Sequence, residues 1–507
     1  MHTALLLEMA AEGLGSRVAL GSSNSGVTFA KLLDRARHVS LQITQSGCSR
    51  VAYVGLNSEA FPIALFAAGL AGRPFAPLNY RLPDADLRAI LARTAPSLVI
   101  ADDELLHRVS GIEGVQIVAR SSFVRDSEPF AAGDPAAGVA AATEPEDIAV
   151  LLFTSGTTGE PKAAVLRHRH LTAYVVSTVE FMASGAHECA LISVPPYHIA
   201  AVSAALTSTF AGRRMVHLEA FSAEEWVRTA AEEHVTHAMV VPTMLGRILD
   251  CMESGNQLLP DLRHLSYGGG RMPVQTIERA LRLLPKVDFV NAYGLTETSS
   301  TICMLTPEDH RIAAASEDAR VRARLASVGR PLPTIELNVR DPDGRPVPLG
   351  IEGEIWVRGE QVSGEYLNKK TVSADGWFPT QDCGSLDEGG FLFLAGRLDD
   401  VIVRGGENIS PGEIEDVLRT HPTVQDVAVI GLPDTEWGER IVAVVVSRAT
   451  DRTDAQVDAL RQFVRERLRS TKTPGEIVFR AQLPYTETGK LLRRALKKEL
   501  ASAPGGR

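Results

Sequence analysis

Cysteine is scarce in this chain of 507 residues, and its five copies are scattered. They are Cys48, Cys189, Cys251, Cys303 and Cys383, an odd number without any CxxC pair. This spacing indicates neither a disulfide framework nor a zinc site. A reducing cytoplasm is therefore the expected location.

Long apolar runs and a basic excess are lacking as well. The most apolar stretch, residues 61–72, is shorter than the ~20 residues that span a bilayer and favours a buried helix. The N-terminus, MHTALLLEMAAEGLGSR, has no basic region ahead of its apolar part, so we expect no secretory signal. The net charge of -10 gives no general attraction for nucleic acid or anionic lipid. Neither nucleic acid nor integral membrane association is expected, and the oligomeric state stays open.

What the chain does have is ordinary globular composition. Apolar residues make up 45% and charged residues 22%, which is far from the signature of disorder. The length exceeds what one compact core usually holds, so several domains are expected.

Apolar runs alternate with helical stretches through most of the chain. Between residues 17 and 100 runs such as VAYVGL alternate with stretches such as EAFPIALFAAGLAG, and a second alternation runs from residue 148 to about residue 325. This pattern predicts βα units with a largely parallel sheet. Residues 127–146 are rich in Ala, Gly, Pro and acids and predict a surface connection before the strand IAVLLFT.

The sequence pattern changes from βα alternation to short β-like runs in the last third of the chain. The runs TIELNVRD, GEIWVRG and GFLFLAG predict a small β subdomain. After LAGRLDD, alternating helical and strand patterns predict a compact αβ segment that ends in the basic helix LLRRALKKEL. The predicted fold class is therefore α/β: a large N-terminal domain, residues 1–398, of two βα subdomains plus a small β subdomain, followed by a small α+β C-terminal domain, residues 399–507.

The strongest local signal is LLFTSGTTGEPK, residues 151–162. Glycines, hydroxyls and a lysine there concentrate donors that suit a polyphosphate. It is not a Walker loop, because Glu160 and Pro161 separate the second glycine from Lys162. Taken alone, the stretch could also be a surface turn. The candidate phosphate-binding residues are Thr154, Ser155, Gly156, Thr157, Thr158, Gly159 and Lys162.

This loop resembles that of the adenylate-forming superfamily of acyl-CoA synthetases, peptide-synthetase adenylation domains and firefly-type luciferases. Five further blocks resemble the family in the same order: PPYHIAA (195–201), NAYGLTET (291–298), GWFPTQDCG (376–384), GRLDDVIVRGGENISPGEIE (396–415) and PYTETGKLLRR (484–494). The resemblance implies a carboxylic acid as substrate, ATP, Mg²⁺ and coenzyme A as cofactors, and a mobile C-terminal domain.

The resemblance also implies a nucleotide site. Tyr293 offers a flat face for a purine, while Thr296 and Glu297 pair a hydroxyl with a carboxylate suited to phosphate and Mg²⁺. Asp382 and Arg397 resemble the pair that holds the ribose hydroxyls, although singly such residues are usually solvated surface charges. Further candidates are Gly269, Gly270, Asn291 and Gly294, with Thr158 beside Glu297 as a candidate magnesium ligand.

Three further residues match the positions that the family uses for catalysis and for domain rotation. His198 matches the histidine that helps place the acyl carboxylate, although a lone histidine would more often be structural. Lys490 matches the adenylating lysine, whose cation can contact both carboxylate and phosphate as pyrophosphate leaves; the alternative is a solvated lysine before a basic helix. Asp399 matches the hinge between an adenylating and a thioester-forming pose.

In the second pose the glycine pair Gly405 and Gly406 would let a slim pantetheine arm pass, and Lys472 is a weaker candidate for the CoA nucleotide. The sequence departs from the family pattern at Ala163, Tyr197 and Gln381. Gln381 stands where glycine usually precedes the ribose-binding aspartate, so the backbone there is expected to differ.

The acyl pocket is expected along small side chains. The candidates are Tyr197, Ala200, Ala201, Ala204 and Gly268, together with Gly269 and Gly270. They favour a medium-to-large apolar acid, which leaves fatty, aryl and polycyclic or terpenoid acids open. The alternatives are an acyl-AMP ligase that passes the acyl group to a carrier protein, a more distant luciferase-like oxygenation, and a non-catalytic adenylate-binding homologue.

Overall fold

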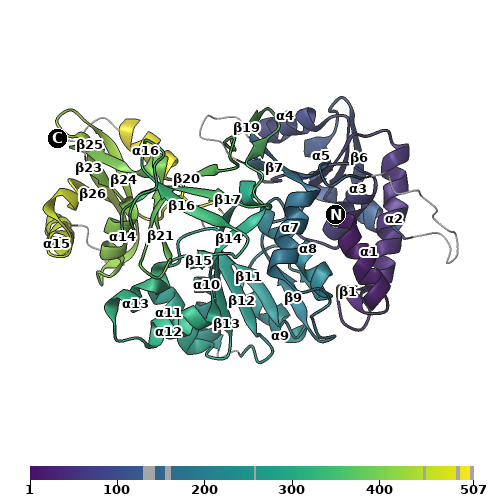
Figure 1. Cartoon of the computed structure of the whole chain (residues 1–507), viewed down its shortest axis with the longest axis horizontal. Coiled ribbons are helices and arrows are strands. Elements are labelled where there is room, and N and C mark those ends of the chain that lie inside the picture. The colour runs from purple at the N-terminus through teal and green to yellow at the C-terminus, as the bar shows by residue number, and fades with distance from the viewer. Residues whose placement is uncertain are drawn as a thin grey trace.

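The computed structural model describes residues 1–128, 143–154, 162–255, 258–405, 407–448, 453–486 and 491–502. The chain forms a large body of two mixed sheets and one antiparallel sheet, followed by a small α+β domain (Figure 1). The small domain lies at one end of the view and helices α1 (Thr3–Leu14) and α2 (Phe29–Gln45) at the other. The predicted α/β fold class is confirmed.

The first sheet has eight strands in the order β19-β18-β8-β7-β4-β3-β5-β6. Its strands from β7 to β6 run parallel, while β8, β18 and β19 are antiparallel additions. The strand expected at IAVLLFT is β7. The bounds are β3 Arg50–Val54, β4 Phe75–Pro77, β5 Ser97–Ala101, β6 Val115–Ala119, β7 Ile148–Thr154, β8 Lys162–Arg167, β18 Glu365–Tyr366 and β19 Lys369–Lys370.

The second sheet has nine strands in the order β15-β14-β13-β12-β11-β9-β10-β1-β2. The six from β13 to β1 run parallel, so their carboxyl ends meet at one edge. The bounds are β1 Val18–Leu20, β2 Val27–Thr28, β9 Cys189–Ile192, β10 Arg214–His217, β11 His237–Val240, β12 His264–Gly268, β13 Asp288–Leu295, β14 Ser300–Leu305 and β15 Arg330–Pro331.

Alternation along the strands divides the apolar side chains into layers. In β3, Val51 and Tyr53 face a core shared with helices between the two sheets, whereas Ala52 and Val54 face the opposite side. Helix α3 (Ala60–Leu70) lies in the shared core with every residue buried, as the apolar stretch predicted. The shared layer also holds α1, α2, α7 (His168–Thr178) and α8 (Ile199–Ala211).

Further helices cover the outer faces. Helices α4 (Asp84–Thr94) and α5 (Leu106–Val109) cover the first sheet, and α9 (Ala223–Glu232), α10 (Pro242–Gly255) and α11 (Val274–Leu283) cover the second. The remaining helices of the body are α6 Arg120–Asp126, α12 Pro307–Ala315, α13 Ala319–Ala323 and the 3₁₀ turns η1 Asp103–Leu105, η2 Thr296–Thr298 and η3 Arg324–Ala326. None of the helices in the described ranges has the length and apolar character needed to cross a bilayer.

The expected β subdomain is a four-stranded antiparallel sheet in the order β16-β17-β20-β21. The bounds are β16 Glu336–Arg340, β17 Gly353–Arg358, β20 Phe378–Leu386 and β21 Leu392–Arg397. Strand β20 contains the TQDCG motif, which the sequence did not mark as a strand, and it pairs with β21 so that Asp382 lies opposite Arg397.

The small domain follows the turn η4 (Leu398–Asp400). Its sheet runs β23-β22-β25-β24, with β26 beside β25. Helices α14 and α15 cover one face and α16 the other. The bounds are β22 Ile402–Arg404, β23 Glu407–Ile409, α14 Pro411–Arg419, β24 Val424–Asp434, β25 Gly438–Ser447, α15 Asp454–Arg465, η5 Ser470–Lys472, β26 Glu476–Arg480 and α16 Arg493–Ser502.

Candidate active site

Tyr293, Asp382 and Arg397 form a connected polar group. The Tyr293 hydroxyl donates to Asp382 Oδ2 at 2.7 Å, and Arg397 Nη1 donates to Asp382 Oδ1 at 3.0 Å. Tyr293 is only 8% exposed, so its ring offers little surface for stacking and its hydroxyl instead fixes the carboxylate. Burial and the Asp382 charge raise the pKa of Tyr293 well above its usual value, so the hydroxyl stays a donor.

Glu297 joins this group from η2, the turn that follows β13. Burial lowers the pKa of Arg397, but the carboxylates of Asp382 and Glu297 more than offset it and leave that pKa raised. On its other side, Glu297 Oε1 accepts a hydrogen bond of 2.6 Å from the Tyr366 hydroxyl. Lys162 Nζ lies 5.9 Å from the centre of the Tyr366 ring. The structure therefore brings Lys162, Glu297, Asp382 and Arg397 to one place.

The candidate phosphate loop is the stretch of the chain between β7 and β8. Its ends are fixed, because Thr154 pairs with Lys162 across the two strands and the Thr154 hydroxyl donates to the Lys162 carbonyl at 3.4 Å. Lys162 is exposed. The candidates Ser155, Gly156, Thr157, Thr158 and Gly159 lie outside the described residues.

The nucleotide candidates Asn291 and Gly294 and the acyl-pocket candidate Gly268 pack within the fold, whereas Gly269, Gly270 and Thr296 are exposed or partly exposed. Asn291 is buried and donates from its side-chain amide to the Ser327 carbonyl at 3.0 Å, which is a tie within the fold. A Cβ at Gly294 would fall 1.8 Å from the Ser300 carbonyl oxygen, and one at Gly268 would fall 2.3 Å from that of Ala292. Both glycines therefore permit close strand packing. Gly269 has a φ of +78°, Gly270 follows it, and Thr296 is partly exposed.

His198 stands at the N-terminus of α8, after the carboxyl end of β9. Tyr197 packs edge-on against Tyr80 with ring centres 5.8 Å apart, and against His198 at 4.7 Å. Burial raises the pKa of Tyr197 to about 12. A helix N-terminus favours an anion, so this position suits the carboxylate of an acid.

The small residues of α8 separate by helical periodicity. Ala200 and Ala204 lie four residues apart and are partly exposed, together with Thr207. Ala201 lies about 100° around the helix from Ala200 and is 1% exposed in the core. Ala201 therefore packs inside the body rather than along the stripe of Ala200 and Ala204.

The described candidates of the small domain make contacts within that domain. Gly405 donates its N–H to the Trp437 carbonyl at 2.8 Å, and Lys472 Nζ donates to Glu413 Oε2 at 2.5 Å. Asp399 lies in η4, where its carbonyl accepts from Lys497 at 3.3 Å. Lys490 and Gly406 lie outside the described residues.

Tyr366 is a site residue that the sequence did not single out. It lies in the stretch SGEYLNK, which is outside the six blocks that resemble the family. A single sequence therefore gave no signal for it. Only the pairing of β18 with β8, far apart along the chain, reveals its position.

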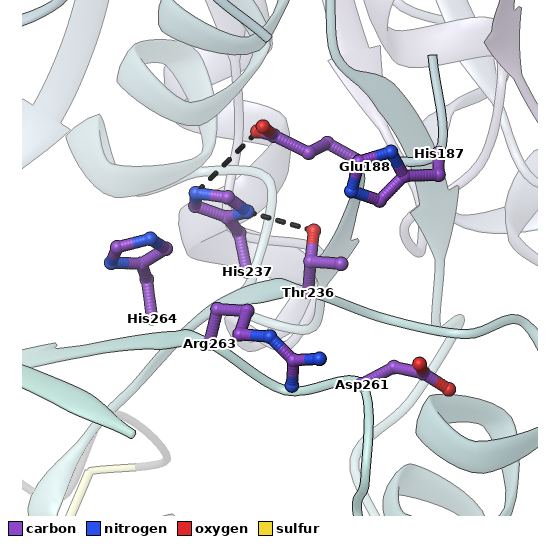
Figure 2. Close-up of a pocket in the computed structure, with 7 residues that line it drawn as sticks. All are labelled: His187, Glu188, Thr236, His237, Asp261, Arg263 and His264. Carbon is purple, nitrogen blue, oxygen red and sulfur yellow. Dashed lines mark hydrogen bonds and ion pairs between the residues drawn. The ribbon is translucent and has the colours of Figure 1, made fainter. Parts of the chain in front are cut away.

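A separate cavity of about 90 Å³ lies at the opposite edge of the second sheet (Figure 2). It is bounded by His187, Glu188, Thr236, His237, Asp261, Arg263 and His264. His237 and His264 start their strands and stack with ring centres 4.5 Å apart. The cavity is therefore at the amino ends of these strands, whereas Tyr293 lies near the carboxyl end of β13 and Glu297 in the turn after it. The cavity is separate from the candidate active site.

Comparison with known proteins shows the family of the chain. A family model of AMP-binding enzymes matches residues 7–367, and one of the AMP-binding enzyme C-terminal domain matches residues 413–490. The chain is 32% identical over 491 residues to a feruloyl-CoA synthase of an Amycolatopsis species, covering 95% of each chain. It is 31% identical over 487 residues to the fatty acid–[acyl-carrier-protein] ligase ScoC of Streptomyces coeruleorubidus, covering 93% of this chain and 91% of that one.

Among solved structures, ATP-bound MatB from Rhodopseudomonas palustris matches with a TM-score of 0.85 at 25% identity, covering 99% of each chain. The chain therefore belongs to the family of AMP-binding enzymes, in the adenylate-forming superfamily that its motifs predicted. Within that class it is an AMP-forming acyl-CoA ligase.

Proposed function

We propose that this ligase activates an apolar carboxylic acid as its acyl-adenylate, with release of pyrophosphate, and then transfers the acyl group to coenzyme A. The proposal rests on the approach of four charged residues to one another, namely Lys162, Glu297, Asp382 and Arg397. Lys162 comes from the first sheet, Glu297 from the turn after β13 of the second sheet, and Asp382 and Arg397 from the antiparallel sheet.

The nucleotide fits this group by its chemistry. Asp382 accepts from Tyr293 on one oxygen and from Arg397 on the other, and a carboxylate at this place is a suitable acceptor for the ribose hydroxyls. Arg397 would donate to the same hydroxyls, and Thr296 and Lys162 would meet the phosphates. The Lys162 cation offsets the charge that an in-line displacement develops.

Mg²⁺ fits the same group. Among the described residues no set of three or more His, Cys, Asp or Glu side chains could hold a metal by itself. A magnesium ion carried by a nucleotide needs only one or two carboxylates, because phosphates and water complete its coordination. Glu297 supplies such a carboxylate, and the ion would supply further neutralisation of phosphate charge.

The acid would lie along α8. Its carboxylate would sit at the helix N-terminus beside His198, with its apolar part along Ala200, Ala204 and Thr207. One carboxylate oxygen attacks the α-phosphorus, the bond to the bridging oxygen breaks, and pyrophosphate leaves. Lys490 would bring a cation to both reacting anions and reduce their repulsion.

Transfer to coenzyme A would follow a rotation of the small domain. We place the domain boundary at about residue 398 and the hinge at Asp399, at the turn that separates β21 from the last sheet. In this structure Val403, Arg404 and Gly405 hydrogen bond to Glu439, Thr471 and Trp437 of the same domain. Rotation would bring Gly405 and Gly406 to face the candidate active site of the large domain, and Lys472 would contact the CoA nucleotide.

The substrate class that we propose is a medium-to-large apolar acid. The small residues on α8 support it, as do relatives named for ferulate and for fatty acids. Aryl, fatty and polycyclic or terpenoid acids are the classes to compare.

The test is pyrophosphate release with ATP and Mg²⁺ for a panel of these acids, with and without coenzyme A. We expect release that depends on the acid and a CoA thioester as product. The Lys490→Ala variant should lose adenylate formation but still form thioester from supplied acyl-adenylate, because the lysine serves the first step alone. Equal loss of both half-reactions, or no release with any acid, would contradict the proposal.

A second acceptor is the pantetheine thiol of a carrier protein. The relative named as an acyl-carrier-protein ligase favours testing it. Adenylate without CoA thioester, together with transfer to a loaded carrier protein, would favour this acceptor over coenzyme A.

A further inference from the structure

Residues 361–366, which we call the junction segment, are attached to the return strand of the phosphate loop. Tyr366 pairs with Ala164 of β8. The Glu365 carboxylate accepts two bonds from Arg167, at 3.0 and 2.7 Å. The Ser363 hydroxyl also donates to the Val165 carbonyl. The first sheet therefore holds the segment in place.

The same segment is attached to the turn that carries Glu297. The N–H groups of Ser363 and Gly364 donate to the Glu297 carbonyl at 2.9 and 3.1 Å. The buried Gln361 side chain donates to the carbonyls of Thr298 and Thr301 at 3.0 and 2.8 Å. The junction segment thus connects the phosphate loop of the first sheet to the acidic turn of the second.

Tyr366 completes this connection with its side chain. Its hydroxyl bond of 2.6 Å to Glu297 Oε1 is short and charge-assisted. Burial and the Glu297 carboxylate raise the pKa of Tyr366, so it remains a donor. A carboxylate bound through one oxygen is fixed in rotation, and its second oxygen keeps acceptor capacity for a cation. Lys162 lies against the ring of the same tyrosine.

We propose that Tyr366 is a positioning residue that orients the Glu297 carboxylate toward the magnesium ion of the nucleotide, while the junction segment sets the spacing between that carboxylate and the phosphate loop. This inference rests on the proposed role of Glu297.

The test is calorimetric binding of ATP to Tyr366→Phe, with Mg²⁺ and separately with EDTA. Phenylalanine keeps the ring beside Lys162 and removes only the hydroxyl. We expect ATP to bind about tenfold more weakly in Mg²⁺, which corresponds to about 1.4 kcal/mol, and unchanged in EDTA. General damage to the site would weaken binding in both conditions.

Tyr53→Phe is the matched control. Tyr53 is a buried tyrosine of the first sheet whose hydroxyl donates to the Leu56 carbonyl at 2.5 Å, and it has no part in the nucleotide group. We expect this variant to lose thermal stability but to bind ATP in Mg²⁺ like the wild type. Weakening of the same size in both variants would overturn the inference.

A double-mutant cycle with Glu297→Gln separates this inference from the function on which it rests. If Tyr366 acts through Glu297, the two substitutions together should weaken Mg²⁺-dependent binding no more than Glu297→Gln alone. Additive effects would overturn the positioning role and leave the proposed function intact. A Glu297→Gln variant that binds ATP in Mg²⁺ normally would overturn both the positioning role of Tyr366 and the proposed role of Glu297, whereas acid-dependent pyrophosphate release tests the activity itself.

Discussion

Gln381 has a backbone conformation that is unfavourable for a residue with a side chain. It precedes Asp382 and has a φ of +63°, in the left-handed region that favours glycine. A side chain there costs roughly 1–2 kcal/mol. Its side-chain amide donates to Glu354 at 2.8 Å, but this hydrogen bond is exposed and contributes little to the free energy of unfolding. The departure from glycine expected at this position therefore appears as local strain.

Gln381→Gly should stabilise the protein by about 0.5–1 kcal/mol, because relief of the left-handed cost exceeds the greater freedom of glycine in the unfolded chain. The measurement is the urea midpoint of the transition that includes β20. Gln381→Ala is the control, since it removes the bond to Glu354 but keeps a Cβ. Equal midpoints for the two variants would mean that the backbone carries no strain.

At the scale of elements, the pairing of α16 with α14 secures the end of the segment that carries Lys490. Lys490 precedes Arg493 by three residues. Arg493 begins α16, and its Nη2 lies 2.5 Å from Glu415 Oε1 on α14. Glu415 is 2% exposed and also accepts from the Val429 N–H at 2.8 Å. A buried carboxylate of this kind depends on its cation.

Arg493→Met should destabilise the small domain by about 3 kcal/mol, because it leaves Glu415 buried without its closest cation. Adenylation should fall with it. Hydrogen exchange of α14 and β24 amides measures the loss of stability. Arg465→Met, an exposed arginine of α15, should change little. Adding Glu415→Gln to Arg493→Met should restore much of the protection, and failure to do so would argue against the ion pair.

The helices and strands were largely predictable from the sequence, whereas the contacts between side chains of different elements were not. Helix α3 and strand β7 are local patterns of apolar residues, so they could be found in advance. The partners of Glu297 could not, because Tyr366 and Arg397 lie far along the chain and approach it only through sheet pairing. Ala201 shows the same limit: only the packing of α8 decides which side of that helix is open.

At the scale of the whole molecule, the two domains are held together in this structure by polar contacts. Arg271 of the body pairs with Asp416 of α14, and the Ser410 hydroxyl donates to the Ala395 carbonyl at 2.6 Å. Burial raises the pKa of Glu352, near which Glu413 and Lys472 of the small domain lie. Rotation about residue 399 would exchange these contacts for others.

Asp399→Pro should leave adenylation within about twofold of the wild type and slow thioester formation at least about tenfold, because proline fixes φ at the proposed hinge. Stopped-flow measurement of each half-reaction separates the two. Asp399→Ala keeps backbone freedom and serves as the control. A proline variant with both steps unimpaired would exclude rotation at this residue.

Folding lowers the pKa of two buried histidines, His168 and His310, and of two partly buried ones, His217 and His237. Burial lowers the pKa of His168, His217 and His310 to about 4, and that of His237 to about 2, with Arg213 and His264 adding to the effect. These side chains are neutral in the folded state. Below the unfolded value of about 6.5 the unfolded chain binds protons that the folded chain does not, so stability is present above that pH and is lost as pH falls.

His237 offers the clearest test, because it borders the cavity of Figure 2 beside Glu188 and Thr236. Its replacement by asparagine keeps a polar atom near Thr236 and removes the titrating ring. Between about pH 6.5 and pH 5 each such histidine contributes up to about 1.4 kcal/mol per pH unit. Hydrogen exchange of β11 amides across this range should therefore show a shallower loss of protection in His237→Asn than in the wild type. Parallel slopes would mean that His237 binds protons equally in the folded and unfolded chain, so that folding does not lower its pKa.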